Sequence, residues 1–395
     1  MEKKKIMTIF GTRPEAIKMA PIIKEIEKDV RFESCVVVTA QHREMLDQVL
    51  ETFAIKTDYD LNIMMPNQTL TAITSRSIAL LDDVFDQVKP DMVLVHGDTT
   101  TTFAAALTAF YHQIPIGHVE AGLRTYDKYS PFPEEMNRQM TDALADLYFA
   151  PTSLSRDNLL KANYDASQIY VTGNSAIDAL AYTVTPEFSH EALKNSEAKK
   201  ILITMHRREN LGQNMMQVFR AINQILDKHA NIEIIFPMHK NPKIRALIST
   251  HLKPSSRLHL IEPLDVFEFH NLAKRSDLIL TDSGGIQEEA PSLGVPVLVL
   301  RESTERPEGV AAGTLKVVGT FEEDVVSAVD GLLSDPVAYE KMATAQNPYG
   351  DGKTSERIVS IIARYFDSTV EILPEFSDKT TPNRKGNPDE KKLVD

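Results

Sequence analysis

Three carboxylic acids in the first 140 residues stand where they could move protons during a reaction. Asp98 follows the most apolar segment of the first half, Glu120 follows another apolar segment, and Glu134 follows a proline-stiffened loop. Carboxylates in such positions can act as general acids and bases. Other roles remain open at this point: Asp98 could cap a helix, Glu120 could be a polar residue at a sheet end, and Glu134 with Glu135 could be a surface charge pair.

Two groups of basic residues could bind an anionic substrate. Gly11 ends the first apolar segment, and Arg13 and Lys18 stand near the start of the helix that follows. Helix N-termini attract anions through their free amides, so this turn could hold a phosphate. His206 and Arg207 follow the first apolar segment of the second half and suit the same role. Solvated surface cations are the alternative for both groups.

The strongest local motif is Asp-Ser-Gly-Gly-Ile-Gln-Glu-Glu in the second half. An apolar segment passes through Ser283, Gly284 and Gly285 into a helix, so backbone amides are left to bind a pyrophosphate. Glu289, one turn into that helix, could accept hydrogen bonds from ribose hydroxyls. Arg306 follows the next apolar segment and should face the same place. A glycine-rich turn without a ligand is the alternative.

These motifs lie in an alternation of short β-branched segments and amphipathic helical segments, which is typical of an α/β fold with parallel sheets. We predict strands at 6–10, 35–39, 92–96, 116–119, 147–149, 169–171, 201–204, 232–236, 258–261, 278–281, 297–300 and 315–318. A chain of 395 residues is too long for one core, so we expect two doubly wound domains. We place their boundary near Gly173, with a ligand cleft between the carboxyl ends of their strands.

Composition excludes several functional classes. The chain has 43 Lys and Arg against 56 Asp and Glu, and its net charge of −13 argues against nucleic acid or an anionic membrane as the main partner. A single cysteine, Cys35, excludes a disulfide framework and a cysteine-based zinc site. No apolar segment is long enough for a signal peptide or a membrane span, so we expect a cytoplasmic protein. The polar segment 374–395 is predicted to be a mobile tail.

Taken together, the motifs resemble those of the bacterial non-hydrolysing UDP-N-acetylglucosamine 2-epimerases. The resemblance covers about residues 5–366. It rests on eight motifs in the same order: Phe-Gly-Thr-Arg-Pro-Glu-Ala-Ile-Lys (10–18), His-Gly-Asp-Thr (96–99), His-Val-Glu-Ala-Gly-Leu-Arg (118–124), Pro-Phe-Pro-Glu-Glu-Met-Asn (131–137), His-Arg-Arg-Glu-Asn (206–210), Asp-Ser-Gly-Gly-Ile-Gln-Glu-Glu (282–289), Thr-Glu-Arg-Pro-Glu (304–308) and Asn-Pro-Tyr-Gly-Asp-Gly (347–352).

The resemblance implies a GT-B-like fold of two Rossmann-type domains, residues 1–172 and 173–353, with the last helix, about 354–366, returning to the first domain. It also implies a homodimer that needs neither NAD nor a metal. Members of the family interconvert UDP-N-acetylglucosamine and UDP-N-acetylmannosamine for cell-surface polysaccharide synthesis. The UDP-sugar is then the expected partner, both as substrate and as activator at a second site.

Residue roles follow from the same resemblance. The implied catalytic residues are Asp98, Glu120, Glu134, His206 and Lys18. The implied UDP-binding residues are Arg13, Lys18, His206, Phe269, Ser283, Gly284, Gly285, Glu289 and Arg306. Matching positions of the activating second site are Gln41, His42, Arg43, Arg207 and His239. The chain departs from the family pattern at Glu44, Asn67 and Leu264.

The resemblance further implies an elimination of UDP that leaves 2-acetamidoglucal, followed by re-addition on the other face. Three alternatives stay open from the sequence. A glycosyltransferase of the same architecture would need an acceptor, and a hydrolysing epimerase would release free N-acetylmannosamine. A sensor of nucleotide sugars would bind UDP without turnover.

Overall fold

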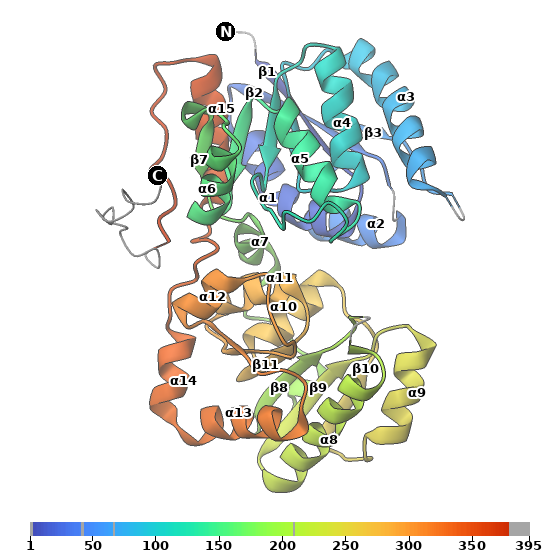
Figure 1. The fold of residues 1–395 in the computed structure, drawn as a ribbon, viewed down its shortest axis with the longest axis vertical. Helices are drawn as coiled ribbons and strands as arrows, with labels where there is room; N and C mark the ends of the chain where they lie inside the picture. Colours follow the sequence, from blue (N-terminus) through green and yellow to red (C-terminus); the bar gives the residue numbers. More distant parts are fainter. Residues whose placement is uncertain (1–2, 41–42, 66–67, 208–209, 379–395) are drawn as a thin grey trace, which may run out of the picture.

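The structure is a computed structural model that describes residues 3–40, 43–65, 68–207 and 210–378. Two parallel β-sheets, each covered by helices, form the two halves of the molecule in Figure 1. The first half is built from the N-terminal residues, coloured blue to green, and the second from the yellow to orange segment. The helix α7 (Ala176–Thr183) lies between the two halves.

The first sheet has seven strands in the order β3-β2-β1-β4-β5-β6-β7. In that order the strands are β3 (Tyr59–Asp60), β2 (Phe32–Val38), β1 (Lys4–Phe10), β4 (Met92–His96), β5 (Ile116–Val119), β6 (Leu147–Ala150) and β7 (Ile169–Val171). The order reverses between β1 and β4, which is the point where doubly wound sheets place their ligands. The motifs that contain Arg13, Asp98 and Glu120 follow β1, β4 and β5 and therefore flank this point.

The second sheet repeats the plan with six strands in the order β10-β9-β8-β11-β12-β13. In that order they are β10 (Leu258–Ile261), β9 (Ile232–Pro237), β8 (Lys199–Thr204), β11 (Leu278–Thr281), β12 (Val297–Val299) and β13 (Leu315–Val317). Its order reverses between β8 and β11, so His206 and the Ser-Gly-Gly turn come from the two strands beside the reversal. The two Rossmann-type sheets confirm the predicted α/β fold class.

All twelve predicted strands are present, with ends that differ by no more than three residues. The short strand β3 was not predicted, because two residues carry too little periodicity to recognise. Burial on both faces explains why the strands read as apolar runs. In β4, for example, all five residues are buried.

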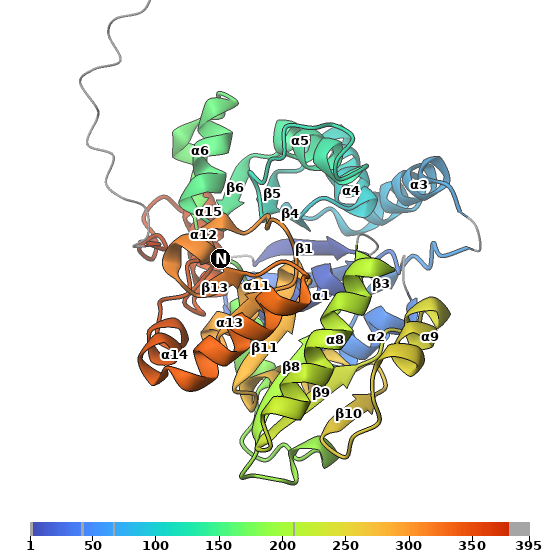
Figure 2. The same cartoon turned by 60° about the horizontal axis from the view of Figure 1, so that its bottom comes forward.

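Helices cover both faces of the two sheets. Those of the first half are α1 (Arg13–Lys28), α2 (Arg43–Thr52), α3 (Leu70–Val88), α4 (Thr100–Tyr111), α5 (Glu134–Leu144) and α6 (Ser153–Lys161). Those of the second half are α8 (Gln213–Lys228), α9 (Pro242–His251), α10 (Val266–Lys274), α11 (Gly284–Glu289), α12 (Pro307–Ala312), α13 (Glu322–Ser334) and α14 (Pro336–Ala343). Short 3₁₀ helices occupy Ala166–Gln168, Glu191–Leu193 and Ala290–Leu293. Figure 2 shows α8 and α13 side by side across one face of the second sheet.

The chain returns to the first half at its C-terminal end. The helix α15 (Thr354–Phe366) packs against α1, and its residues Ile358, Ile361 and Ile362 belong to the hydrophobic core of the first sheet. In Figure 1 this red helix stands beside the blue and green elements although it follows the second half in sequence.

Residues 374–378 differ from the predicted mobile tail, because they are packed against the first half. The amide of Phe376 donates to the carbonyl of Val171 over 2.8 Å, and the Phe376 side chain is only 5% exposed. The guanidinium of Arg357 lies 5.8 Å from the centre of the Phe376 ring. Glu375 and Asp378 add side-chain hydrogen bonds to Arg156 and Ser153, so aromatic and polar contacts together anchor this segment. The rest of the predicted tail, 379–395, lies outside the described residues.

Candidate active site

Glu120 lies directly after β5, at the carboxyl edge of the first sheet, with φ of +65°. Its carboxylate forms an ion pair with the ammonium of Lys18, which reaches it from α1. Burial alone would raise the pKa of Glu120, but the charge of Lys18 outweighs it and lowers the pKa to about 2. The structure thus keeps Glu120 ionised. A buried carboxylate of this kind can accept a proton.

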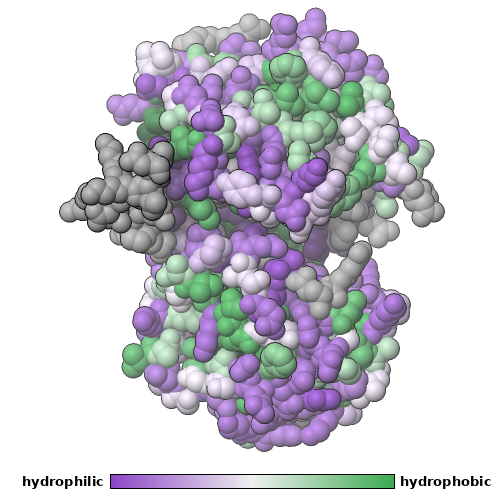
Figure 3. All heavy atoms as spheres, viewed as in Figure 1, coloured by the Kyte–Doolittle hydropathy of each residue, from purple (hydrophilic) through white to green (hydrophobic). Residues whose placement is uncertain are grey.

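Lys18 also connects the two halves of the molecule. Its ammonium is 3.8 Å from the carboxylate of Glu288 on α11, and Glu288 forms a second ion pair with Arg306. The amide nitrogen of Asn174 donates to Glu288 over 2.9 Å and to Glu120 over 3.4 Å. Two cations and two carboxylates from both halves therefore meet between the sheets. Figure 3 shows an indented surface between the halves that is bordered mainly by hydrophilic side chains.

Asp98 lies at the end of the neighbouring strand β4 and is held by α5. Its carboxylate accepts a hydrogen bond from Arg138 over 2.6 Å, and its backbone carbonyl accepts one from the side chain of Asn137 over 2.9 Å. Burial raises the pKa of Asp98, and the charge of Arg138 offsets only part of this effect. The pKa values of Asp98 and Glu120 are thus shifted in opposite directions, which is the pattern expected of a general acid and a general base.

Glu134 and Glu135 at the start of α5 have different surroundings. The negative charge of Glu134 contributes to the raised pKa of Asp98. Glu135 is fully buried and accepts hydrogen bonds from the amides of Thr125 and Tyr126. The interpretation of Glu135 as a surface charge is therefore wrong, because its carboxylate satisfies backbone donors of the loop that precedes α5.

In the turn before α1, two backbone amides are bonded to a side chain of the same turn. The carboxylate of Glu15 accepts hydrogen bonds from the amides of Gly11 and Thr12, over 3.1 and 2.8 Å. The same carboxylate accepts bonds from the hydroxyls of Thr99 and Thr102 at the start of α4. Glu15 therefore occupies the two amides that precede the first turn of α1, and the phosphate site expected from Arg13 and Lys18 stays a prediction.

The Ser-Gly-Gly turn after β11 retains donors of the kind expected. Ser283 is the N-cap of α11 but accepts no side-chain hydrogen bond from its first turn. The amides of Gly284 and Gly285 belong to that turn, where a helix has no backbone acceptors of its own. The guanidinium nitrogens of Arg306 and Arg207 lie 3.5 and 3.8 Å from the place that a Cβ on Gly284 would take. Backbone donors and two cations thus converge, which suits a diphosphate.

His206 begins the loop after β8, and the buried carboxylate of Asp282 shapes this loop. Asp282 accepts hydrogen bonds from the amides of His206 and Arg207 and from the side chain of Asn210. Burial lowers the pKa of His206, while Asp282 opposes the shift and the positive charges of its neighbours, including Arg207 and Arg13, add to it. Arg13 belongs to the first half, so a charge of that half contributes to the lowered pKa of His206.

Glu289 and Phe269, the residues expected at the nucleoside, lie together on α11 and α10. A ring nitrogen of His270 pairs with the Glu289 carboxylate over 3.2 Å. Phe269 packs at the edge of a hydrophobic cluster that also includes Leu264. An apolar ring beside a carboxylate could border a base and hold a ribose.

The residues of the expected second site are described only in part. Gln41 and His42 lie outside the described residues, as does Asn67, while Arg43 pairs with Asp60 at the start of α2. The ring of His239 stacks on that of His206, with centroids 6.0 Å apart. Arg207 lies beside Gly284, as described above. These last two residues therefore border the residues expected to bind UDP.

Sequence reasoning missed three residues of this site. Glu288 stands next to Glu289, and only the helix register decides which of the two faces Lys18. Asn174 follows the glycine at the predicted domain boundary, and its contacts come from residues 54 and 114 positions away. His96 stands in the His-Gly-Asp-Thr motif, where no local pattern distinguishes it, although it lies 3.8 Å from Glu120.

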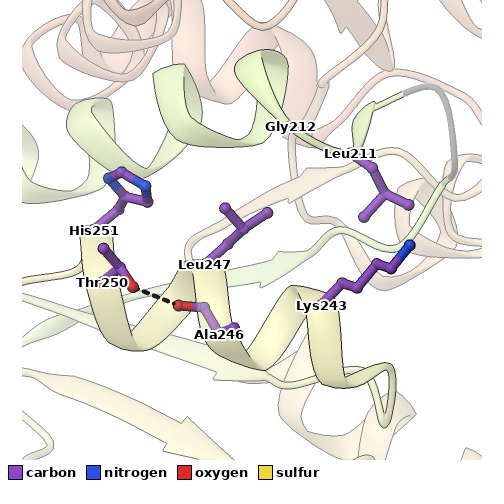
Figure 4. A pocket seen from close by; sticks show the side chains of 7 residues that line it. All are labelled: Leu211, Gly212, Lys243, Ala246, Leu247, Thr250 and His251. Carbon is purple, nitrogen blue, oxygen red and sulfur yellow. Dashed lines mark hydrogen bonds between the residues drawn. The ribbon is translucent and has the colours of Figure 1, made fainter.

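Other features of the structure do not compete with this site. A shallow groove of about 480 Å³ lies between α8 and α9 (Figure 4) and is lined by Leu211, Gly212, Lys243, Ala246, Leu247, Thr250 and His251. It contains no carboxylate and one flexible cation. Within the described ranges, no group of three His, Cys, Asp or Glu side chains is arranged to hold a metal ion. No helix among these residues has the length and apolar composition that a membrane span requires.

Comparisons with known proteins agree with this geometry. The family model described as UDP-N-acetylglucosamine 2-epimerase matches residues 24–363. The UDP-N-acetylglucosamine 2-epimerase of Bacillus subtilis (strain 168) is 58% identical over 380 residues, which are 96% of this chain and all of that protein. The fold is also similar to that of a spinosyn rhamnosyltransferase, with a TM-score of 0.57 at 14% identity over 91% of this chain and all of the other.

Two solved structures of similar proteins hold nucleotides. S. aureus MnaA in a co-structure with UDP has a TM-score of 0.87 and 55% identity, over 95% of this chain and all of that one. The enzyme of Neisseria meningitidis bound to UDP-GlcNAc has a TM-score of 0.83 and 50% identity, over 91% of this chain and all of that one. Similarity over nearly the full length of both chains, together with a site of paired cations and carboxylates between two GT-B-like sheets, shows that this chain is an isomerase of the UDP-N-acetylglucosamine 2-epimerase family.

Proposed function

We propose that the protein interconverts UDP-N-acetylglucosamine and UDP-N-acetylmannosamine by eliminating UDP and adding it back. The C2 proton is not acidic, because C2 is not next to a carbonyl group. Cleavage of the C1–O bond solves this problem: UDP leaves with the bonding electrons, a carboxylate takes the C2 proton, and a C1–C2 double bond forms in 2-acetamidoglucal. Protonation of C2 on the opposite face and attack of UDP on C1 complete the reaction.

The observation that supports this proposal is the junction of Lys18, Glu120, Glu288 and Arg306 between the two sheets. Cations placed there can stabilise a departing diphosphate, since fixed charges act most strongly where water is excluded. We propose that Arg13, Lys18, His206, Arg306 and the Ser283–Gly285 turn hold the diphosphate, and that Glu289 and Phe269 hold the nucleoside.

The opposite pKa directions of the two acids support a division of labour between them. Glu120, with its low pKa, is the proton acceptor at C2, and Asp98, with its raised pKa, is the donor on the opposite face. Their roles exchange when the reaction runs backward. Glu134 stabilises the positive charge that develops at C1 when UDP departs, since its negative charge also acts on Asp98.

Turnover in D₂O tests the proposal against the alternatives that the sequence left open. With UDP-N-acetylglucosamine, both UDP-sugars should appear in the NMR spectrum with deuterium at C2 and without free sugar. A glycosyltransferase would leave C2 unlabelled, and a hydrolysing epimerase would release free N-acetylmannosamine and UDP. A sensor would bind UDP and change nothing. Each of these three results would contradict the proposed reaction.

The proposal extends to the assembly and the use of the product. We propose a homodimer whose product supplies cell-surface polysaccharide synthesis and whose second UDP-sugar site includes Arg207 and His239. Light scattering should give twice the chain mass of 44.2 kDa. Initial rates that rise sigmoidally with UDP-N-acetylglucosamine would support the second site, and hyperbolic kinetics would argue against it.

A further inference from the structure

Two buried histidines, His96 and His118, lie on the neighbouring strands β4 and β5, and they differ in the hydrogen bonds of their rings. Both ring nitrogens of His118 have partners: Nδ1 is 2.6 Å from a carboxylate oxygen of Asp142, and Nε2 is 2.7 Å from the carbonyl oxygen of Gly97. In the described part of the chain, neither ring nitrogen of His96 has a hydrogen-bond partner. His118 is therefore a structural residue, and the position of His96 needs another explanation.

The cost of leaving His96 in this state is considerable. Its side chain is only 5% exposed, and a buried polar group without a partner destabilises a folded protein. An apolar side chain of similar volume would avoid this cost. Unsatisfied buried polar groups in native proteins often belong to a functional site.

The surroundings of His96 point to the reacting sugar. Its Nε2 is 3.8 Å from a carboxylate oxygen of Glu120, which is too long for a hydrogen bond. The next residue, Gly97, has φ of +67°, and a Cβ placed on it would lie 3.6 Å from the other oxygen of Glu120. The turn that carries His96 and Asp98 thus packs on Glu120. The imidazole of His96 therefore borders the position that C2 of the sugar must take between Asp98 and Glu120.

The protonation state of the His96 imidazole also suits a position beside the ionised Glu120. Burial lowers the pKa of His96 to about 3, with Glu120 opposing the shift and Lys18 adding to it. A neutral ring has one donor and one acceptor nitrogen. It can therefore bind a hydroxyl or an amide without adding a charge beside Glu120.

We propose that His96 is a substrate-contacting residue that hydrogen-bonds the N-acetylhexosamine ring of the UDP-sugar beside Glu120. The inference rests on the proposed function, because it places the sugar at the two acids. The hydrogen bond holds C2 against Glu120 and contributes nothing to the binding of the UDP moiety.

Replacement of His96 by leucine and by glutamine tests this role. For His96→Leu, kcat/KM for UDP-N-acetylglucosamine should fall about 10²-fold, as for the loss of one positioned donor. The Kd of UDP should stay within about twofold, and Tm should not fall, because an unsatisfied polar group is removed. His96→Gln keeps a donor and an acceptor and should recover at least about tenfold of the lost activity. His251→Leu, in the groove of Figure 4, is the surface control with unchanged turnover.

Every other outcome overturns the proposal. Wild-type turnover of His96→Leu would show that the ring only packs. An equal loss of affinity for UDP and for UDP-N-acetylglucosamine would show an effect on the whole cleft, and a glutamine variant no better than leucine would exclude a hydrogen bond. Failure of the proposed reaction is a separate result: the wild-type protein would then show no C2 exchange in D₂O, while the ratio of the two affinities would still report on His96.

Discussion

Asp98 and Glu120 follow the neighbouring strands β4 and β5, yet the charges around them differ. Lys18 forms an ion pair with Glu120 and Arg138 forms one with Asp98, and both cations are largely buried. Arg306 adds to the lowering of the pKa of Glu120, whereas the negative charges of Glu120 and Glu134 raise the pKa of Asp98. The two acids can therefore differ in protonation at the same pH.

Substitution of either acid should reduce turnover strongly. For Asp98→Asn and Glu120→Gln we expect kcat to fall by about 10²-fold or more, the usual contribution of general acid–base catalysis. Both amides keep the shape of the acid, so the Kd of UDP measured by calorimetry should change little. Steady-state assays with near-wild-type turnover in both variants would discard the assignment.

Replacement of Lys18 should change the ionisation of Glu120. In Lys18→Met the main charge that lowers the pKa of Glu120 is lost, burial dominates, and its pKa should rise above the ordinary value of 4.5. In the wild type, Glu120 stabilises the fold above about pH 4.5, and this contribution is lost as the pH falls toward 2. In the Lys18→Met variant this pH dependence reverses. The folded protein then favours protonated Glu120, so ionisation of Glu120 at higher pH lowers the stability.

Infrared titration of the carboxylates measures this shift, with the Lys18→Met, Glu120→Gln double variant as the reference. Lys28→Met is the matched control, because Lys28 pairs with Glu25 on the exposed face of the same helix. A spectrum of Lys18→Met in which Glu120 still titrates near pH 2 would contradict the proposed ion-pair control.

At the scale of the elements, hydrogen bonds connect the start of α1 to the start of α4. Glu15 binds two amides of its own turn and two threonine hydroxyls of α4, and the hydroxyls of Thr39 and Thr101 hydrogen-bond beside Gly11. These contacts fix the helix that carries Lys18 relative to the turn that carries Asp98. Precise placement of a cation and an acid from different helices requires such a connection.

Gly11→Ala should destabilise this junction. The added Cβ would lie 2.2 Å from the Thr39 hydroxyl and 2.7 Å from that of Thr101, and overpacking of this kind costs about 1–3 kcal/mol. Gly331→Ala in α13 is the control: a Cβ there meets nothing within 4 Å, so stability should rise by about 0.5–1 kcal/mol. Urea unfolding followed by circular dichroism compares them, and an unchanged midpoint for Gly11→Ala would contradict this interpretation.

At the scale of the whole molecule, the two halves are joined by more than the link after β7. The chain passes through the second half and returns with α15 and residues 374–378 to the first. Asn174 and Glu288 add polar contacts at the cleft itself. The C-terminal segment therefore links the two halves, and charged residues of both halves form the site. The site is complete only when the two halves are in contact.

Phe376→Ala should weaken the C-terminal anchor. Removal of a buried phenylalanine side chain typically costs about 3–5 kcal/mol, and part of this should appear as a lower Tm of the first half. Phe321→Ala is the matched control, because Phe321 is 59% exposed and its loss should change stability by less than about 0.5 kcal/mol. Scanning calorimetry with equal Tm values for the two variants would show that Phe376 contributes nothing.

The sequence alone was enough for the fold class, the twelve longer strands and the grouping of motifs at strand ends. Apolar periodicity and glycine placement are local properties, and parallel sheets bring the carboxyl ends of their strands to one edge. For the same reason Asp98, Glu120 and the Ser283–Gly285 turn could be singled out before any coordinates were known.

Tertiary structure decided which side chains face one another. Only packing could tell that Glu288 rather than Glu289 reaches Lys18, that Glu15 occupies the amides of Gly11 and Thr12, and that Phe376 anchors the segment 374–378. It also distinguished His96 from His118. The physical reason is that a hydrogen bond or an ion pair depends on distances of about 3 Å between residues far apart in the chain, and no local pattern fixes these distances.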